Sequence, residues 1–268
     1  MKPCSTKIYS LYGENIPGFP YEIPSIVHYA PAERRSDAAV VIFPGGGYSH
    51  RAPHEGNGYA EFLAGLGINA FVVHYRCTPC FFPDPLLDAR RGVRFVRANA
   101  ERFGISPDRV AVMGSSAGGH LAALASNYRG PLEGEGVDEI DALPYLPNLT
   151  ILCYAVLSAD EAVSHQGSFH NLLGPAYADR FDVDPTLLVA DDTPPAFIWH
   201  TATDTGVNVI NSYRYATALR EHNIPCEMHI FPVGPHGMGL AAYNPHVAQW
   251  SGLLANYLRL IGFLPKED

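Results

Sequence analysis

The segment RVAVMGSSAGGHLAALAS, residues 109–126, decides how the rest of the chain is interpreted. Its first five residues are an apolar run typical of a buried strand, and the small residues after Ser116 are typical of a closely packed helix. Between the two lies GSSAG, which fits the pattern G-x-S-x-G. A serine on so sharp a turn requires neighbours without bulky side chains, and glycine lies two residues before and two residues after Ser116. The segment therefore predicts a strand–turn–helix unit that exposes the Ser116 hydroxyl.

This setting favours Ser116 as a nucleophile. The turn would direct the hydroxyl toward the positive end of the following helix, which stabilises developing negative charge. A chance glycine–serine turn is the alternative, and the strand before and helix after make it the weaker interpretation. Ser115 occupies the variable position of the motif and should point elsewhere.

A second glycine-rich segment, PGGGY at 44–48, follows the apolar run AVVIF. Attack by a hydroxyl on an ester carbonyl creates an oxyanion, which needs hydrogen-bond donors already in place. We predict that the N–H groups of Gly45, Gly46 and Ala117 form this oxyanion hole, with Gly47 as a further candidate. A glycine turn without chemical role is the alternative, because three glycines also suit a tight strand exit.

The remaining candidates follow two later strands. The run AFIWHT at 196–201 leads to Asp204, and CEMHIF at 226–231 leads to His236 in a glycine-flanked loop. An imidazole can take the Ser116 proton near neutral pH, and a carboxylate can orient that imidazole. We therefore predict a Ser116–Asp204–His236 triad. The other histidines of the neighbouring segments, at 120, 200 and 229, are interpreted as packed or surface side chains.

Strand-like runs alternate with helical patterns along the whole chain, which is typical of an α/β protein with a mostly parallel sheet. Eight strand candidates suit an open, doubly wound sheet flanked by helices, and residues 1–268 are read as one domain. The stretches 130–147 and 160–195 are too long for plain connections, so we expect inserted loops or a lid over the site. The strand candidates are 8–11, 26–29, 39–43, 69–75, 109–113, 151–157, 196–201 and 226–231, and the main helix candidates are 85–103, 211–223 and 246–261.

The formal net charge of −9 argues against binding to nucleic acid or to anionic membranes. The arginines between 90 and 102 lie among apolar residues at helical spacing, so we expect them to form the solvated face of an amphipathic helix. The N-terminus lacks the apolar run of a signal peptide, which predicts a cytoplasmic protein. The 5 cysteines are interpreted as reduced thiols, since Cys77 and Cys80 have no second pair to complete a metal site.

Several longer segments extend these observations beyond the single motifs. They are VVIFPGGGYSH at 40–50, RVAVMGSSAGGHLAA at 109–123, HQGSFHNLLG at 165–174, TATD at 201–204 and GPHGMGL at 234–240. With them the chain resembles the esterase/lipase branch of the α/β-hydrolase superfamily, and more narrowly the bacterial acetyl esterases linked to xylan breakdown. The resemblance implies an α/β-hydrolase fold and hydrolysis of small acyl esters, such as O-acetyl groups of sugars or xylo-oligosaccharides, without metal or cofactor.

Other functions remain open at this stage. The same triad would serve a feruloyl esterase, an amidase or a peptidase, because acyl size depends on the insertions and on Tyr48, which we expect to contact substrate. A non-catalytic binding protein of the same fold would normally lack one triad residue. A lipase would need an apolar lid, whereas the insertion at 130–147 is acidic. The sequence also leaves a homo-oligomer open.

Overall fold

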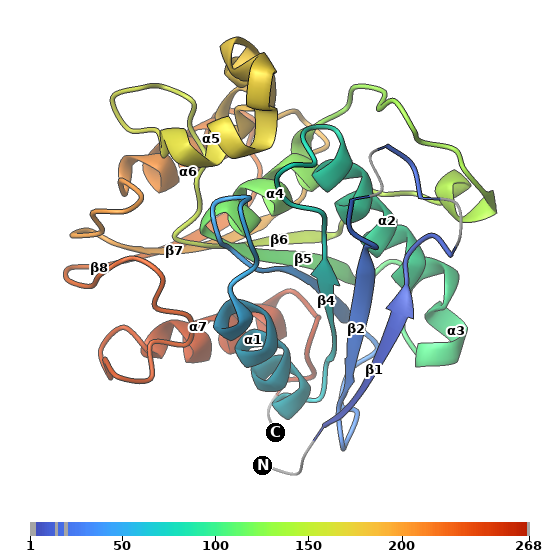
Figure 1. Ribbon diagram of the computed structural model, residues 1–268. Helices are drawn as coiled ribbons and strands as arrows, with labels where there is room; N and C mark the ends of the chain where they lie inside the picture. The colour runs from blue at the N-terminus through green and yellow to red at the C-terminus, as the bar shows by residue number, and fades with distance from the viewer. Residues whose placement is uncertain (1–3, 14–15, 19–20, 267–268) are drawn as a thin grey trace.

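An eight-stranded sheet forms the centre of the protein, for which a computed structural model describes residues 4–13, 16–18 and 21–266 (Figure 1). The strands lie in the order β1-β2-β4-β3-β5-β6-β7-β8. They are β1 (Ser5–Ser10), β2 (Ser25–Ala30), β3 (Ala39–Phe43), β4 (Asn69–His74), β5 (Val110–Ser115), β6 (Leu149–Cys153), β7 (Ala196–Thr201) and β8 (Cys226–Phe231). β2 runs antiparallel to both its neighbours, and the remaining pairs are parallel. The predicted mostly parallel sheet is confirmed.

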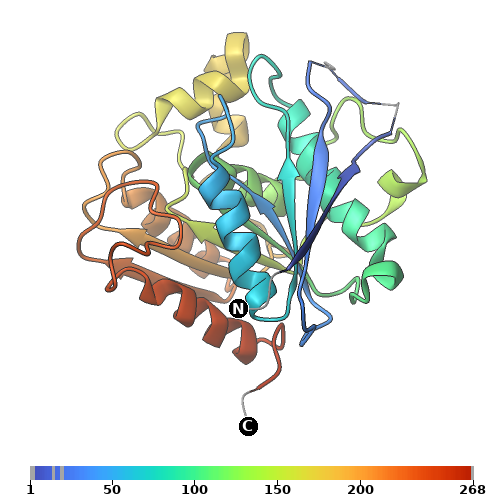
Figure 2. The same ribbon diagram turned by 60° about the horizontal axis from the view of Figure 1, so that its bottom comes forward.

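Helices cover both faces of this sheet. They are α1 (Pro53–Gly65), α2 (Asp84–Ala98), α3 (Ala100–Phe103), α4 (Ser116–Asn127), α5 (Gln166–Leu173), α6 (Ile210–Glu221) and α7 (Gln249–Leu260), with the 3-10 helices η1 (Glu139–Ala142), η2 (Gly174–Val183) and η3 (Pro185–Leu187). Successive strand residues point to opposite faces, so Val41 joins the core under α2, α4 and α6, while Val40 and Ile42 join the core under α1 and α7. Figure 2 shows α1 and α7 together on one face.

The parallel strands end at a common edge, where their connecting loops meet. The glycine loop, which we define as residues 44–48, follows β3, and Ser116 follows β5. The loops with Asp204 and His236 follow β7 and β8. This arrangement brings together residues that are distant in sequence.

Strand β6 is shorter than predicted at its carboxyl end. The sequence favoured a strand over 151–157, but β6 ends at Cys153, since Tyr154 adopts a φ of 37°. A positive φ is incompatible with an extended strand. The predicted helix over 85–103 is likewise divided into α2 and α3 at Asn99.

The expectation that the arginines of α2 are solvated is wrong for the middle of the helix. Arg90 and Arg91 are only 1% and 2% exposed. Arg90 Nη1 lies 2.9 Å from Glu135 Oε1, and Arg91 Nη1 lies 2.9 Å from Asp141 Oδ1. The acidic insertion at 130–147 folds over α2 and supplies the counter-charges that make burial of these guanidinium groups tolerable.

Among the described residues, no helix is both long and apolar enough to cross a membrane.

The ion pairs between α2 and the insertion predict a difference between two neighbouring acids. Asp141 accepts hydrogen bonds from Arg91 and from the N–H groups of Gly136 and Val137, whereas Glu139 is exposed. Asp141→Ala should lower the free energy of unfolding by about 2–3 kcal/mol, because it removes an acidic partner of the buried Arg91 guanidinium group. The control Glu139→Ala should lower it by less than about 0.5 kcal/mol. Urea unfolding measures both, and equal effects would contradict this role of the insertion.

Candidate active site

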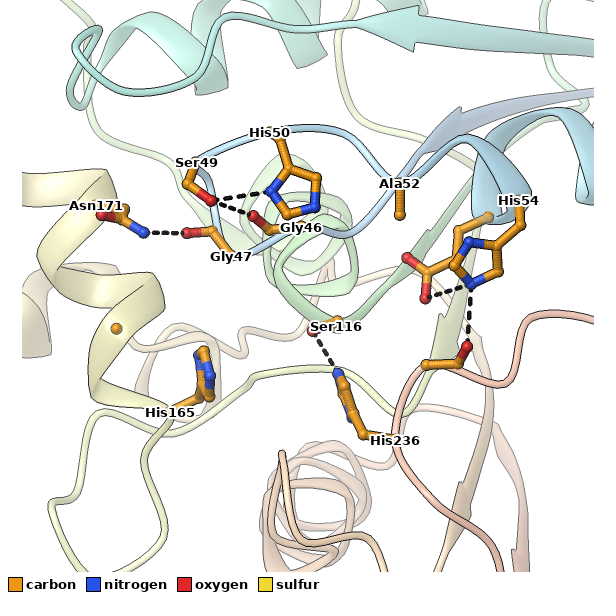
Figure 3. Close-up of a pocket in the computed structure, with 13 residues that line it drawn as sticks. Gly46, Gly47, Ser49, His50, Ala52, His54, Ser116, His165, Asn171 and His236 are labelled. Carbon is orange, nitrogen blue, oxygen red and sulfur yellow. Dashed lines mark hydrogen bonds and ion pairs between the residues drawn. The ribbon is translucent and has the colours of Figure 1, made fainter.

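The three residues predicted as a triad form one continuous chain of hydrogen bonds. Figure 3 shows the link between Ser116 and His236. Ser116 Oγ lies 2.8 Å from His236 Nε2, and His236 Nδ1 lies 2.7 Å from Asp204 Oδ2. Ser116 is the first residue of α4 and has a φ of 52°. Its strained backbone is typical of a serine exposed on a tight strand-to-helix turn.

The glycines around Ser116 are required by close backbone contacts. A Cβ on Gly114 would lie 2.0 Å from the carbonyl oxygen of Gly118, and one on Gly118 would lie 2.0 Å from that of Phe43. The turn thus closes only when both positions lack a side chain, which is the steric reason for the motif.

The Asp204 carboxylate is buried and fully provided with donors. Oδ1 accepts the N–H groups of Gly206 and Val207 at 2.8 and 2.9 Å, and Oδ2 accepts from His236 and, at 3.2 Å, from His200. Burial acts to raise the pKa of Asp204, but hydrogen bonds from His200, His236 and Val207 outweigh it and hold this pKa well below its usual range. The acid therefore stays ionised and fixes the ring of His236.

Sequence reasoning missed the part played by His200. We interpreted it as a packed side chain, and it is indeed fully buried in β7, but its Nε2 donates to Asp204 and to the carbonyl of Val207. Its Nδ1 lies 2.8 Å from Ser212 Oγ. The available signal in the sequence was its position near the end of the strand that leads to Asp204, four residues before that acid.

The N–H group of Gly45 does not have the role in the oxyanion hole that the sequence predicted. Its N–H donates to Glu55 Oε2 over 2.8 Å, away from an incoming oxyanion. A Cβ on Gly45 would also collide with that carboxylate oxygen and with the carbonyl of Ser115. Gly45 is therefore not a donor to substrate in this structure. The candidate oxyanion donors on this loop are the next two residues, Gly46 and Gly47.

The N–H groups of Gly46, Gly47 and Ala117 each share a peptide plane with the carbonyl of the preceding residue. In all three cases that carbonyl accepts a backbone hydrogen bond, which fixes the orientation of the plane. The carbonyl of Gly45 accepts from Ala52 N at 2.8 Å, that of Gly46 from Ser49 N at 3.1 Å, and that of Ser116 from Val156 N at 3.0 Å. In a trans peptide the N–H points opposite to the carbonyl. Three N–H groups are thus directed away from these partners, and Gly46, Gly47 and Ser116 line one cleft.

Tyr48, which we expected to contact substrate, lies in the core instead. It is 1% exposed, and its hydroxyl lies 2.7 Å from His120 Nδ1. His120 Nε2 in turn lies 2.8 Å from the carbonyl of Val183, and burial lowers the pKa of His120 to about 4. The large ring is buried because the glycine loop turns inward at Tyr48, which has a φ of 60°.

The cleft in front of Ser116 has a volume of about 410 Å³. Its walls come from the glycine loop, the start of α1, the His236 loop and the beginning of α5. They consist of Gly46, Gly47, Ser49, His50, Ala52, His54, Glu55, Ser116, His165, Gly167, Asn171, His236 and Gly237. The insertion at 160–195 thus contributes to the cleft, whereas no residue of 130–147 lines it, and Figure 1 places that segment beside α2.

His165 presents a hydrogen-bond donor at this cleft. Its Nδ1 accepts from the backbone N–H of Ser168 at 3.3 Å and lies 2.8 Å from Ser168 Oγ. The proton of the neutral ring is therefore on Nε2. Burial and the nearby His236 lower the pKa of His165, which favours that neutral form. Asn171, one helical turn beyond Ser168, donates to the Gly47 carbonyl at 2.8 Å and ties α5 to the glycine loop.

No group of three or more histidine, cysteine or acidic side chains within the described ranges is arranged to hold a metal ion.

Comparison with known proteins agrees with this fold. The family model described as BD-FAE matches residues 27–141. A solved structure, the acetyl ester-xyloside bifunctional hydrolase from Caldicellulosiruptor lactoaceticus, is 38% identical with a TM-score of 0.90, and the match covers 96% of this chain and 97% of that one. The chain belongs to the α/β-hydrolase family of esterases.

Two curated relatives are longer proteins. Acetylxylan esterase from Xylanibacter ruminicola is 36% identical over 246 residues, which are 88% of this chain and 48% of the relative. Endo-1,4-beta-xylanase B from Butyrivibrio fibrisolvens is 33% identical over 238 residues, which are 86% of this chain and 37% of the relative. The chain therefore spans half or less of the length of these relatives.

Proposed function

We propose that this chain is a serine carboxylesterase that hydrolyses small acyl esters, with O-acetyl groups of sugars or xylo-oligosaccharides as its substrates. The single observation that carries the proposal is the unbroken hydrogen-bond chain from Asp204 through His236 to Ser116 at the cleft. The names of the relatives, an acetylxylan esterase and an acetyl ester-xyloside hydrolase, support the choice of acyl group and alcohol.

In the proposed reaction Ser116 Oγ attacks the ester carbonyl while His236 Nε2 takes its proton. The carbonyl oxygen becomes an oxyanion, which the N–H groups of Gly46, Gly47 and Ala117 stabilise. His236 then gives the proton to the leaving alcohol oxygen, and the carbon–oxygen bond of the ester breaks. Water, deprotonated by His236, attacks the acyl-enzyme. As the second oxyanion collapses, the bond from the acyl carbon to Ser116 Oγ breaks, His236 returns the proton to Oγ, and the acid is released.

We further propose that residues 1–268 act as one catalytic domain whose segment 160–195 forms a wall for the alcohol part of the substrate. His165 belongs to this segment and offers its Nε2–H to a sugar oxygen. Its distinct role would be selection of the alcohol, since the triad and the oxyanion donors together account for bond cleavage. Localisation in the cytoplasm stays a prediction from the sequence, and a homo-oligomer stays open.

Ester hydrolysis should depend on Ser116. Ser116→Ala should lower kcat for p-nitrophenyl acetate by on the order of 10⁴-fold or more, because the nucleophile is lost. The control Ser126→Ala removes a buried hydroxyl of the same helix that bonds only within the core, to Ala122 and Thr150, and should retain activity. A series of p-nitrophenyl esters from acetate to octanoate, with a ferulate ester added, measures acyl size. Activity confined to ferulate or to amides would contradict the acetyl esterase proposal.

His165→Leu should separate two substrates. For an acetylated xylo-oligosaccharide, kcat/KM should fall about 10-fold, corresponding to the loss of one hydrogen bond of about 1.4 kcal/mol. For p-nitrophenyl acetate, whose alcohol carries no hydroxyl groups, the change should be less than about threefold. An equal fall for both substrates would show that His165 does not select the alcohol.

A further inference from the structure

A buried tyrosine and a buried glutamate join the two loops that carry the proposed catalytic groups. Tyr154, the first residue after β6, donates its hydroxyl proton to Glu55 Oε1 over 2.7 Å and accepts the N–H of Gly239 at 2.9 Å. Glu55, on α1, accepts the N–H of Gly45 on its other oxygen at 2.8 Å. The path therefore runs from the glycine loop through Glu55 and Tyr154 to the loop of His236.

The directions of these bonds follow from the chemistry of the groups. Two donors, the Gly45 N–H and the Tyr154 hydroxyl, converge on Glu55, which suits an ionised carboxylate. Burial and the charge of Glu55 raise the pKa of Tyr154 well above its usual value, so the hydroxyl keeps its proton. Tyr59, whose hydroxyl accepts from Ser115 Oγ at 2.9 Å, lies 3.1 Å from the Tyr154 hydroxyl. The side-chain oxygens of Glu55 and Tyr154 are therefore all engaged in hydrogen bonds.

Tyr154 is held in this place against a conformational penalty. Its φ of 37° lies in the positive region, which is unfavourable for a non-glycine residue. The turn lets its ring pack edge-on against His236, with centroids 5.1 Å apart and planes at 75°. Tyr154 and Glu55 are 1% and 3% exposed, so solvent does not compete for their hydrogen bonds.

We propose that Tyr154 and Glu55 are positioning residues, which set the distance between the oxyanion donors and the base by bridging the glycine loop and the His236 loop. The inference rests on the proposed esterase function of the same site. Glu55 also lines the cleft, but its two oxygens are taken by the Gly45 N–H and the Tyr154 hydroxyl. The two residues therefore act through Gly45 and Gly239 rather than on the ester itself. Their effect is expressed when the oxyanion forms, because only then must the donors and the imidazolium be correctly placed together.

The bridge is tested with Tyr154→Phe, Glu55→Gln and the double variant. Tyr154→Phe removes the hydroxyl and keeps the ring beside His236. Glu55→Gln cannot accept on both sides, because one of its two atoms becomes a donor. Each single variant should lower kcat for p-nitrophenyl acetate about 10- to 100-fold while KM changes less than about threefold. The double variant should be no slower than the slower single variant, since both changes break one bridge.

A trifluoromethyl ketone provides a second reading, because its adduct with a catalytic serine carries an oxyanion. Its affinity should fall by the same factor as kcat in each variant. Tyr215→Phe is the matched control, since it also removes a buried hydroxyl. Tyr215 lies on α6, and its hydroxyl accepts at 2.7 Å from Asn127 at the end of α4. This control should lose stability in urea unfolding and keep the wild-type kcat.

The outcomes separate the bridge from the proposed function. Variants that unfold at lower urea concentration but keep the wild-type kcat and ketone affinity would overturn the bridge and leave the esterase proposal intact. Multiplicative losses in the double variant would also overturn it, because two independent residues are not one bridge. A wild type that neither hydrolyses esters nor binds the ketone would overturn the esterase proposal itself.

Discussion

The structure depends above all on keeping the Asp204 carboxylate ionised although it is buried. A buried charge is unfavourable unless it is paired and hydrogen-bonded. The turn after β7 supplies two N–H donors, β7 itself supplies His200, and the loop after β8 supplies His236. With the acid fixed in this way, the His236 ring has one orientation, and its far nitrogen meets Ser116. The carboxyl edge of the parallel sheet is what brings these loops together.

The same principle recurs at the other buried charges of the protein. Arg76 and Asp88, both fully buried, form an ion pair at 2.8 Å, and Arg90 and Arg91 face acids of the insertion at 130–147. Glu55 lies behind the glycine loop with donors on both oxygens. Such pairs contribute modest net stability, but removing one partner is strongly unfavourable. They therefore specify where each loop must lie, which is what a site assembled from several distant segments requires.

The sequence was informative where a local pattern had a single physical cause. The alternation of strands and helices predicted the sheet, and the motif around Ser116 and the order of Asp204 and His236 predicted residues that do meet. Interactions between distant segments were not readable. The pattern of α2 could not reveal that its arginines face acids about 45 residues later, and a run of three glycines could not show that Glu55 takes the Gly45 N–H. Tyr48 looked exposed on its loop, but the positive φ of the turn directs it inward.

The most direct test of the account is to identify the residue that reacts with a fluorophosphonate, which traps activated serines covalently. Intact-mass spectrometry and peptide mapping of the product would be compared for the wild type and for His236→Ala. The account predicts one label, on Ser116, and labelling slowed by orders of magnitude when His236 is removed. A label on another residue, or equally fast labelling without His236, would contradict the proposed triad.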